Sequence, residues 1–245
     1  MDTTEHNLLL LADSALPKTV GSFSFSAGLE STFQHDQSGF NLDSFLRHSL
    51  KSVCCTTIPF IKAAFEYPET VSEIDDEFDA ITTCIVSRRS SVTQGRALLT
   101  VWSKALFQIS ADEDINDSIK RFEASVRLGK CFGHHGIVWG LIGRGCGISL
   151  GVPLSNSNKL TGRDRILYVF VFSHARLVLS SAVRMGIIGP YQSQFILASP
   201  SIRGTIQKSL DEGKRLNRGD AGQSWPLLDI FTSRQELLYS RLFNS

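Results

Sequence analysis

The chain has 245 residues, of which 42% are hydrophobic and 20% are charged, and its formal net charge is +1. This composition is ordinary for a soluble globular protein that is long enough to bury a sizeable core. The charge is nearly balanced and forms no long basic or acidic block, so the sequence gives no support for nucleic acid or an acidic membrane surface as a partner.

The first residues contain no recognisable targeting segment. Residues 1–7 are acidic and polar, and only residues 8–12 are continuously apolar. A secretory signal needs a basic start and a longer apolar stretch, so we expect none. The cysteines include no C-x-x-C pair, and we expect reduced thiols in a cytoplasmic protein. They are Cys54, Cys55, Cys84, Cys131 and Cys146.

Apolar residues at helical spacing predict three amphipathic helices, over 42–53, 74–85 and 115–126. Capping-box patterns precede two of them, at Thr70 to Glu73 and at Ser110 to Glu113. Arg88 and Arg89 follow the second helix, where a cation favours the negative end of the helix dipole. We therefore expect one continuous helix to end near these two arginines.

Six glycines recur at alternating steps of four and three, which keeps them on one face of a helix. Each glycine inside a helix costs about 1 kcal/mol relative to alanine, so a compensating close approach of another backbone is expected. The alternative is a flexible loop, but the residues between the glycines are more apolar than exposed loops usually are. The series is Gly129, Gly133, Gly136, Gly140, Gly143 and Gly147.

The most apolar run covers 166–183 and is interrupted by His174 and Arg176. A membrane-spanning helix needs about 20 mostly apolar residues without such charges, so a buried helix of a soluble protein is expected. We expect His174 to be a hydrogen-bonded core residue. Residues 8–11 and 169–172 have strand-forming types, but no alternating pattern recurs. The sequence predicts an all-α, single-domain bundle of eight to eleven helices over 1–245.

Turn residues predict the breaks between these helices. Glycine, proline and short polar side chains gather at six places in the chain. These places are 17–22, 67–68, 151–158, 189–190, 199–200 and 217–224. None is long enough to be a linker between domains, which agrees with a single domain.

No common catalytic motif is present: the sequence lacks the GxxxxGK[ST] nucleotide loop, the GxSxG nucleophile elbow and the HExxH zinc motif. Cys131, His134 and His135 are weak candidates for metal ligands, since residues three or four apart share a helix face. Adjacent histidines point roughly 100° apart on a helix, which suits a shared ion poorly. The alternative is a polar helix start. The carboxylates of 73–79 are expected on a solvated helix face, with a catalytic pair as the minor alternative.

Several short motifs occur in order along almost the whole chain, at 13–17, 21–23, 25–30, 94–99, 133–134, 173–176, 180–186, 188–190, 194, 226, 229–230, 236 and 239–245. Together these motifs resemble the UreF family of urease accessory proteins, and they are most similar to those of its fungal members. The chain departs from the family in three places, one of which is that Gly136 and the residues after it differ from the proline-containing version of that helix. Three residues, 18–20, stand between Pro17 and Gly21, where many relatives have one, and Gln235 stands where bacterial relatives often have histidine.

This resemblance implies an all-helical, non-enzymatic protein that helps to assemble the nickel centre of urease. It implies a chain that bridges a UreD/UreH-type scaffold and the UreG GTPase and regulates that GTPase. It also implies a homodimer that acts on the urease apoprotein, with nickel passed through the complex and no cofactor held stably. A small helical metal carrier using Cys131, His134 and His135, or a helical enzyme with an unrecognised site, remains the alternative.

The resemblance also assigns two groups of partner-binding residues. The C-terminal group matches family regions that contact the scaffold protein. The other group is expected at a dimer or GTPase surface, although Arg184 can equally cap the end of its own helix. The first group is Tyr239, Arg241, Leu242 and Phe243, and the second is Arg184, Gly189, Pro190, Tyr191 and Gln194.

Overall fold

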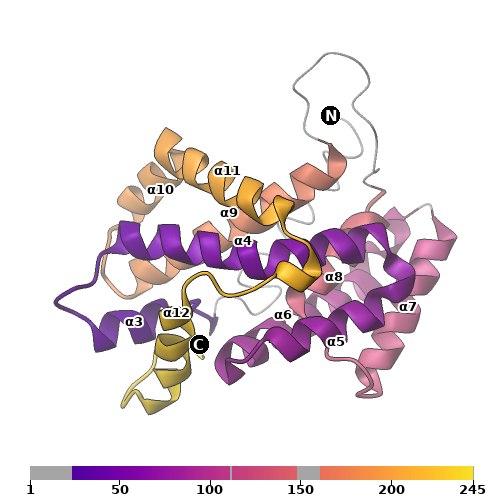
Figure 1. Ribbon diagram of the computed structural model, residues 1–245, viewed down its shortest axis with the longest axis horizontal. Helices are drawn as coiled ribbons and strands as arrows, with labels where there is room; N and C mark the ends of the chain where they lie inside the picture. Colours follow the sequence, from indigo (N-terminus) through magenta and orange to yellow (C-terminus); the bar gives the residue numbers. More distant parts are fainter. Residues whose placement is uncertain (1–23, 111, 148–160, 245) are drawn as a thin grey trace.

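The computed structural model describes residues 24–110, 112–147 and 161–244, and within these ranges the chain is all-α, with ten α-helices and no strand (Figure 1). This confirms the predicted fold class. The helices, joined by short 3-10 and π segments, are α3 (Leu29–His35), α4 (Leu42–Glu66), α5 (Val71–Ile81), α6 (Ile85–Val101), α7 (Glu113–Arg127), α8 (His135–Gly145), α9 (Gly162–Arg184), α10 (Pro190–Ala198), α11 (Pro200–Arg215) and α12 (Pro226–Ser233).

Helix α4 is the centre of the bundle. It packs most extensively against α8 and α11, and α9 also lies against it. The Asn41 side chain caps its first turn by accepting a hydrogen bond from Ser44 N at 2.8 Å. Ile58, Phe60 and Ile61 are almost completely buried in the core that α4 shares with its neighbours. Helix α5 packs against it as well, and the other helices have their main contacts with these neighbours or with one another.

Helix α8 confirms that the glycine series supports close packing. A Cβ atom on Gly140 would lie 2.5 Å from the carbonyl oxygen of Ile61, so the absence of a side chain lets α8 touch the backbone of α4. The family resemblance starts this helix near His134, after Gly129 and Gly133, and so predicts four glycines of the series inside it, but Gly147 lies beyond its end with φ +71°. A left-handed glycine just after the last turn is the usual way for a helix to stop. Three glycines of the series therefore remain inside α8.

The helix predicted over 74–85 is wrong in its extent, because α5 ends at Ile81 and α6 begins at Ile85. The Thr82 hydroxyl donates to the Phe78 carbonyl at 2.7 Å and so satisfies an acceptor at the end of α5. Arg88 and Arg89 consequently lie near the start of α6, not at a helix C-terminus. Each of them pairs with an acidic side chain instead, Arg88 with Asp79 and Arg89 with Glu236.

The capping boxes were also only partly right. Thr70 does precede α5, but its side chain makes no capping hydrogen bond to that helix. Helix α7 is capped by Asp112, whose carboxylate accepts from Ile115 N at 3.2 Å, and Ser110 lies two residues earlier. Both helices therefore begin close to the predicted places, but neither is capped by the side chain that the capping-box pattern predicted.

Helix α9 contains residues 169–172, so the strand considered for that segment is wrong. By length and composition α9 could cross a membrane, but half of its most apolar 18-residue window is buried inside the protein. It packs against α4, α10 and α11, which gives those apolar side chains a protein environment. The predicted features at 8–11, 17–22 and 151–158 lie outside the described residues.

Candidate partner-binding surfaces

The C-terminal region exposes a group of large apolar side chains, which we call the tail surface. It is built by α12, by the short 3-10 turn Arg234–Leu237 and by the irregular segment that follows. Tyr239 is fully exposed and Leu237 is 74% exposed. Large apolar side chains that are left exposed on adjoining segments are a feature of protein-binding sites. The members are Leu227, Ile230, Leu237, Tyr239 and Leu242.

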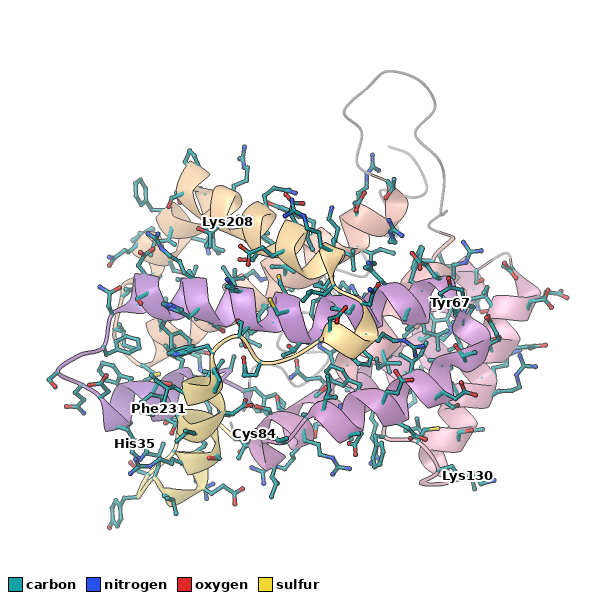
Figure 2. All side chains as sticks on the ribbon, in the orientation of Figure 1. His35, Tyr67, Cys84, Lys130, Lys208 and Phe231 are labelled. Atoms are coloured by element: carbon teal, nitrogen blue, oxygen red, sulfur yellow. The ribbon has the colours of Figure 1, made fainter. Side chains whose placement is uncertain are left out.

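The region is held against α3, with which α12 makes extensive contact. The Ser31 hydroxyl donates to the Phe231 carbonyl at 2.5 Å, and Figure 2 shows Phe231 beside His35 where α12 meets the end of α3. The final residues then fold back over the second residue of α3. There the buried Glu30 carboxylate accepts hydrogen bonds from Leu242 N at 2.7 Å and Phe243 N at 3.1 Å.

Phe243 and Arg184 contact each other, although sequence analysis placed them in different groups. The Arg184 guanidinium lies 4.2 Å from the centre of the Phe243 ring, and Phe243 is only 2% exposed. Burial lowers the pKa of Arg184, and the nearby Glu30 charge opposes that shift. Arg184 therefore belongs to the packing beneath the tail, in contrast to the exposed α10 residues with which it was grouped. The Phe243 side chain packs inside the chain, so it is its neighbour Leu242 that faces solvent.

Helix α10 carries the second group of exposed side chains, which we call the α10 surface. Tyr191 is 92% exposed and Phe195 is 77% exposed, and these two residues share one face because they are four apart. Gly189 and Pro190 form the exposed turn that starts the helix, and Gln194 is also exposed. Sequence analysis missed Phe195, which the four-residue step from Tyr191 could have revealed. Figure 1 shows α10 and α12 on opposite sides of α4.

The three weak metal candidates are not brought together. Cys131 lies near Ser72 and Asp75, while the His135 ring packs against Trp139 and Phe170. Within the part of the chain that the structure describes, no group of three histidine, cysteine or acidic side chains could hold a metal ion. This geometry removes the support for a carrier site made by these three residues.

His134 instead belongs to a hydrogen-bond chain. Its Nε2 atom lies 2.9 Å from Asp79 Oδ1, and its Nδ1 atom lies 3.1 Å from the Ser91 hydroxyl, which in turn accepts from His135 N. Burial lowers the pKa of His134, against the opposing effect of Asp79. A neutral ring that donates from Nε2 and accepts at Nδ1 satisfies all of these partners. These hydrogen bonds hold His134, the residue before the first turn of α8, in place.

The acidic segment 73–79 was expected on a solvated face, and for Asp75 this is wrong. Asp75 is fully buried and accepts hydrogen bonds from the backbone N–H groups of residues 132, 133 and 134, at 2.7 to 2.9 Å. Burial raises the pKa of Asp79, but hydrogen bonds from Arg88 and His134 outweigh this and lower it. Sequence spacing could have indicated this burial. Asp75 and Asp79 are four residues apart, and each directly follows an apolar residue of the buried face of α5, Ile74 or Phe78.

A cavity of about 250 Å³ lies between α4, α6, α8, α9 and α12. Many of its walls are serine and threonine side chains, and the rings of His135 and His174 face it. His174 Nε2 lies 2.8 Å from the Ser49 hydroxyl, so it is the hydrogen-bonded histidine that the sequence predicted. The Nε2 atom of His135 is buried with no hydrogen-bond partner among the described residues. Burial lowers the pKa of each ring to about 4, so both are neutral at pH 7.

The fold and these surfaces define the class of protein: an all-α chain that presents two separate apolar surfaces. The model of the UreF family matches residues 38–155. A UreF-like urease accessory protein of Schizosaccharomyces pombe is 36% identical over 99% of this chain and 98% of its own length. Urease accessory protein F of Arabidopsis thaliana is 30% identical over 96% of this chain and 90% of its own. Urease accessory protein 6 of Cryptococcus neoformans is 27% identical over 98% and 96%.

The chain therefore belongs to the UreF family of urease accessory proteins. This confirms the resemblance that its sequence motifs indicated, including the similarity to fungal members. The relatives are named as accessory proteins of urease, and these names describe no enzymatic reaction of the accessory protein itself.

Proposed function

We propose that this chain bridges a UreD/UreH-type scaffold protein and the UreG GTPase while the nickel centre of urease is assembled. The bridging complex acts on the urease apoprotein in the cytoplasm and regulates the GTPase. In this proposal the chain forms a homodimer, and nickel passes through the complex as cargo without becoming a resident cofactor.

The observation that carries the proposal is the pair of exposed apolar surfaces on opposite sides of α4. A bridge needs two docking surfaces that do not overlap, so that one partner leaves the other surface free. Each surface also contains aromatic side chains, which are enriched among the residues that dominate protein-binding energy. The tail surface is assigned to the scaffold protein and the α10 surface to the GTPase or to the second protomer.

The test uses one double variant for each surface in the full chain. Tyr239→Ala with Leu242→Ala should weaken capture of the scaffold protein, and Tyr191→Ala with Phe195→Ala should weaken capture of the GTPase or dissociate the dimer. Truncation of a central aromatic contact costs about 2 kcal/mol or more, which is roughly thirtyfold in Kd. Affinities measured by calorimetry, together with the oligomer size from light scattering, check both expectations.

Leu128→Ala is the matched control, because Leu128 is 72% exposed but lies at the end of α7, outside both surfaces. It should leave both partners and the oligomeric state unchanged. Normal binding of both partners by the two double variants would contradict the proposal. Loss of both partners in either variant would instead indicate one shared surface and no bridge.

A further inference from the structure

We propose that Glu30 is the positioning residue for partner binding at the C-terminus: its buried carboxylate holds the tail in the conformation that displays the tail surface. This inference rests on the proposed function, because it concerns the surface assigned to the scaffold protein. The inference adds Glu30, a residue near the other end of the chain. A search for exposed side chains would not select it, because it is only 2% exposed.

Three donors, one from the 3-10 turn and two from the tail, converge on this carboxylate. Leu242 N donates to one oxygen at 2.7 Å, while Phe243 N at 3.1 Å and Gln235 Nε2 at 2.6 Å donate to the other. Gln235 also donates to the Phe243 carbonyl at 3.2 Å, which ties the 3-10 turn to the tail. Hydrogen bonds to a charged acceptor are roughly twice as strong as neutral ones. Glu30 is thus the common acceptor for groups that are otherwise separated along the tail.

The tail needs such an anchor because residues 238–244 form no helix of their own. Outside regular structure, backbone N–H groups must find individual partners, and here two consecutive ones find Glu30. The next donor, Asn244 N, reaches the Ser24 carbonyl at 2.6 Å. The conformation of the tail is therefore set by the segment that leads into α3, more than 200 residues earlier in the chain.

Contacts on the other side of the tail complete the arrangement. Arg184 covers the buried Phe243 ring, and Arg89 donates to the Asn244 carbonyl at 3.2 Å while it pairs with Glu236 at 2.6 Å. With Phe243 fixed inward, its neighbour Leu242 is left 60% exposed beside the fully exposed Tyr239. Loss of the anchor would free the tail and scatter these two side chains.

The burial of Glu30 also makes the docked position of the tail energetically favourable. A buried carboxylate is costly unless it is hydrogen-bonded, so Glu30 favours the docked tail over a detached one. A partner that binds the docked tail then meets a surface that is already ordered and loses less conformational entropy on binding. Glu30 contributes to partner affinity in this way without touching the partner.

The test compares Glu30→Ala with wild type, each in the full chain and in a chain shortened after residue 238. In the full chain, Glu30→Ala should speed hydrogen exchange at the amides of residues 242 and 243 and weaken binding of the UreD/UreH-type scaffold by tenfold or more. In the shortened chain the same substitution should cause no further loss of affinity. Binding to the GTPase through the α10 surface should stay within twofold of wild type.

A second pair of variants keeps Glu30 in place, in case Glu30→Ala does not fold. Leu242→Pro removes the N–H donor together with the leucine side chain, and Leu242→Ala removes only most of the side chain. Greater loss of scaffold binding in Leu242→Pro than in Leu242→Ala is expected. Equal losses would overturn the inference.

Two outcomes separate this inference from the proposed function. If Glu30→Ala binds the scaffold protein like wild type while Tyr239→Ala with Leu242→Ala does not, Glu30 is not a positioning residue and the tail surface still stands. If neither variant changes scaffold binding, the assignment of the tail surface itself is wrong. An equal loss of affinity from Glu30→Ala in the full and the shortened chains would mean that Glu30 acts through the overall fold.

Discussion

The close contact between α8 and α4 predicts opposite effects for the same substitution at two helical glycines. Alanine at position 140 would place its Cβ atom 2.5 Å from the Ile61 carbonyl oxygen, and at least 3.0 Å is needed, so the two helices must separate by about half an ångström. The obstructing atom belongs to the helix backbone and cannot rotate away. At position 204, the exposed fifth residue of α11, the new Cβ atom meets nothing within 4 Å.

The magnitudes follow from these two environments. Both substitutions gain about 1 kcal/mol of helix propensity. Overpacking costs about 1–3 kcal/mol, and the rigid backbone contact at 140 favours the upper part of that range. We expect Gly140→Ala to lose about 1–2 kcal/mol of stability and Gly204→Ala to gain about 1 kcal/mol. Gly140→Leu should lose more than Gly140→Ala, since it adds three further carbon atoms at the same contact.

Thermal unfolding followed by circular dichroism checks this prediction. For a domain of this size, 1 kcal/mol shifts Tm by about 2–4 °C, so Gly140→Ala should melt about 2–8 °C below wild type and Gly204→Ala about 2–4 °C above it. Both variants gain the same helix propensity, so the difference between their melting temperatures measures the cost of the close contact between α8 and α4. Equal melting temperatures for the two variants would refute the packing argument.

Two further predictions concern buried polar groups. The folded pKa values of His135 and His174 are about 4, below the unfolded value of about 6.5, so only the unfolded chain binds protons between these limits. Stability should therefore be unaffected above pH 6.5 and fall below it, by up to about 1.4 kcal/mol per pH unit for each histidine. His174→Gln should reduce this loss in urea unfolding compared at pH 7 and pH 5, and an undiminished loss would contradict the burial argument. Asp75→Ala should destabilise the chain by about 3 kcal/mol or more in the same assay, because three backbone N–H groups, two of them in buried residues, lose their acceptor. The exposed Asp76→Ala on the same helix should change little, and similar losses for both would show that burial of Asp75 is unimportant.

The helices could be predicted from the sequence because their causes are local. Apolar spacing located the faces of α4, α5 and α7, and the glycine series located α8 and its contact with another backbone. The break between α5 and α6 was missed because Ile85 continues the helical spacing of Ile81. Only the packed structure shows that the chain turns there and that Arg88 pairs with Asp79 across the turn.

The candidate surfaces were predicted less completely. As partner-binding residues, motif resemblance selected Tyr191, Tyr239 and Leu242, whose side chains are exposed. It also selected Phe243, which is buried, and it did not include the exposed Phe195. Exposure depends on which neighbours cover a side chain, and those neighbours come from distant parts of the chain. For Phe243 they include Arg184 and the segment around Glu30.

By itself, the sequence determined the helical class, the glycine face of α8 and membership of the UreF family, since periodicity, backbone freedom and motifs are written along the chain. The tertiary structure alone decided that Glu30 meets the backbone of Leu242 and Phe243, that Asp75 is buried under three N–H groups, and that the metal candidates diverge. The physical reason is that a carboxylate has the same local pattern whether it faces water or a backbone brought to it by folding. Its role is fixed only when distant donors converge on it and replace the water it has lost.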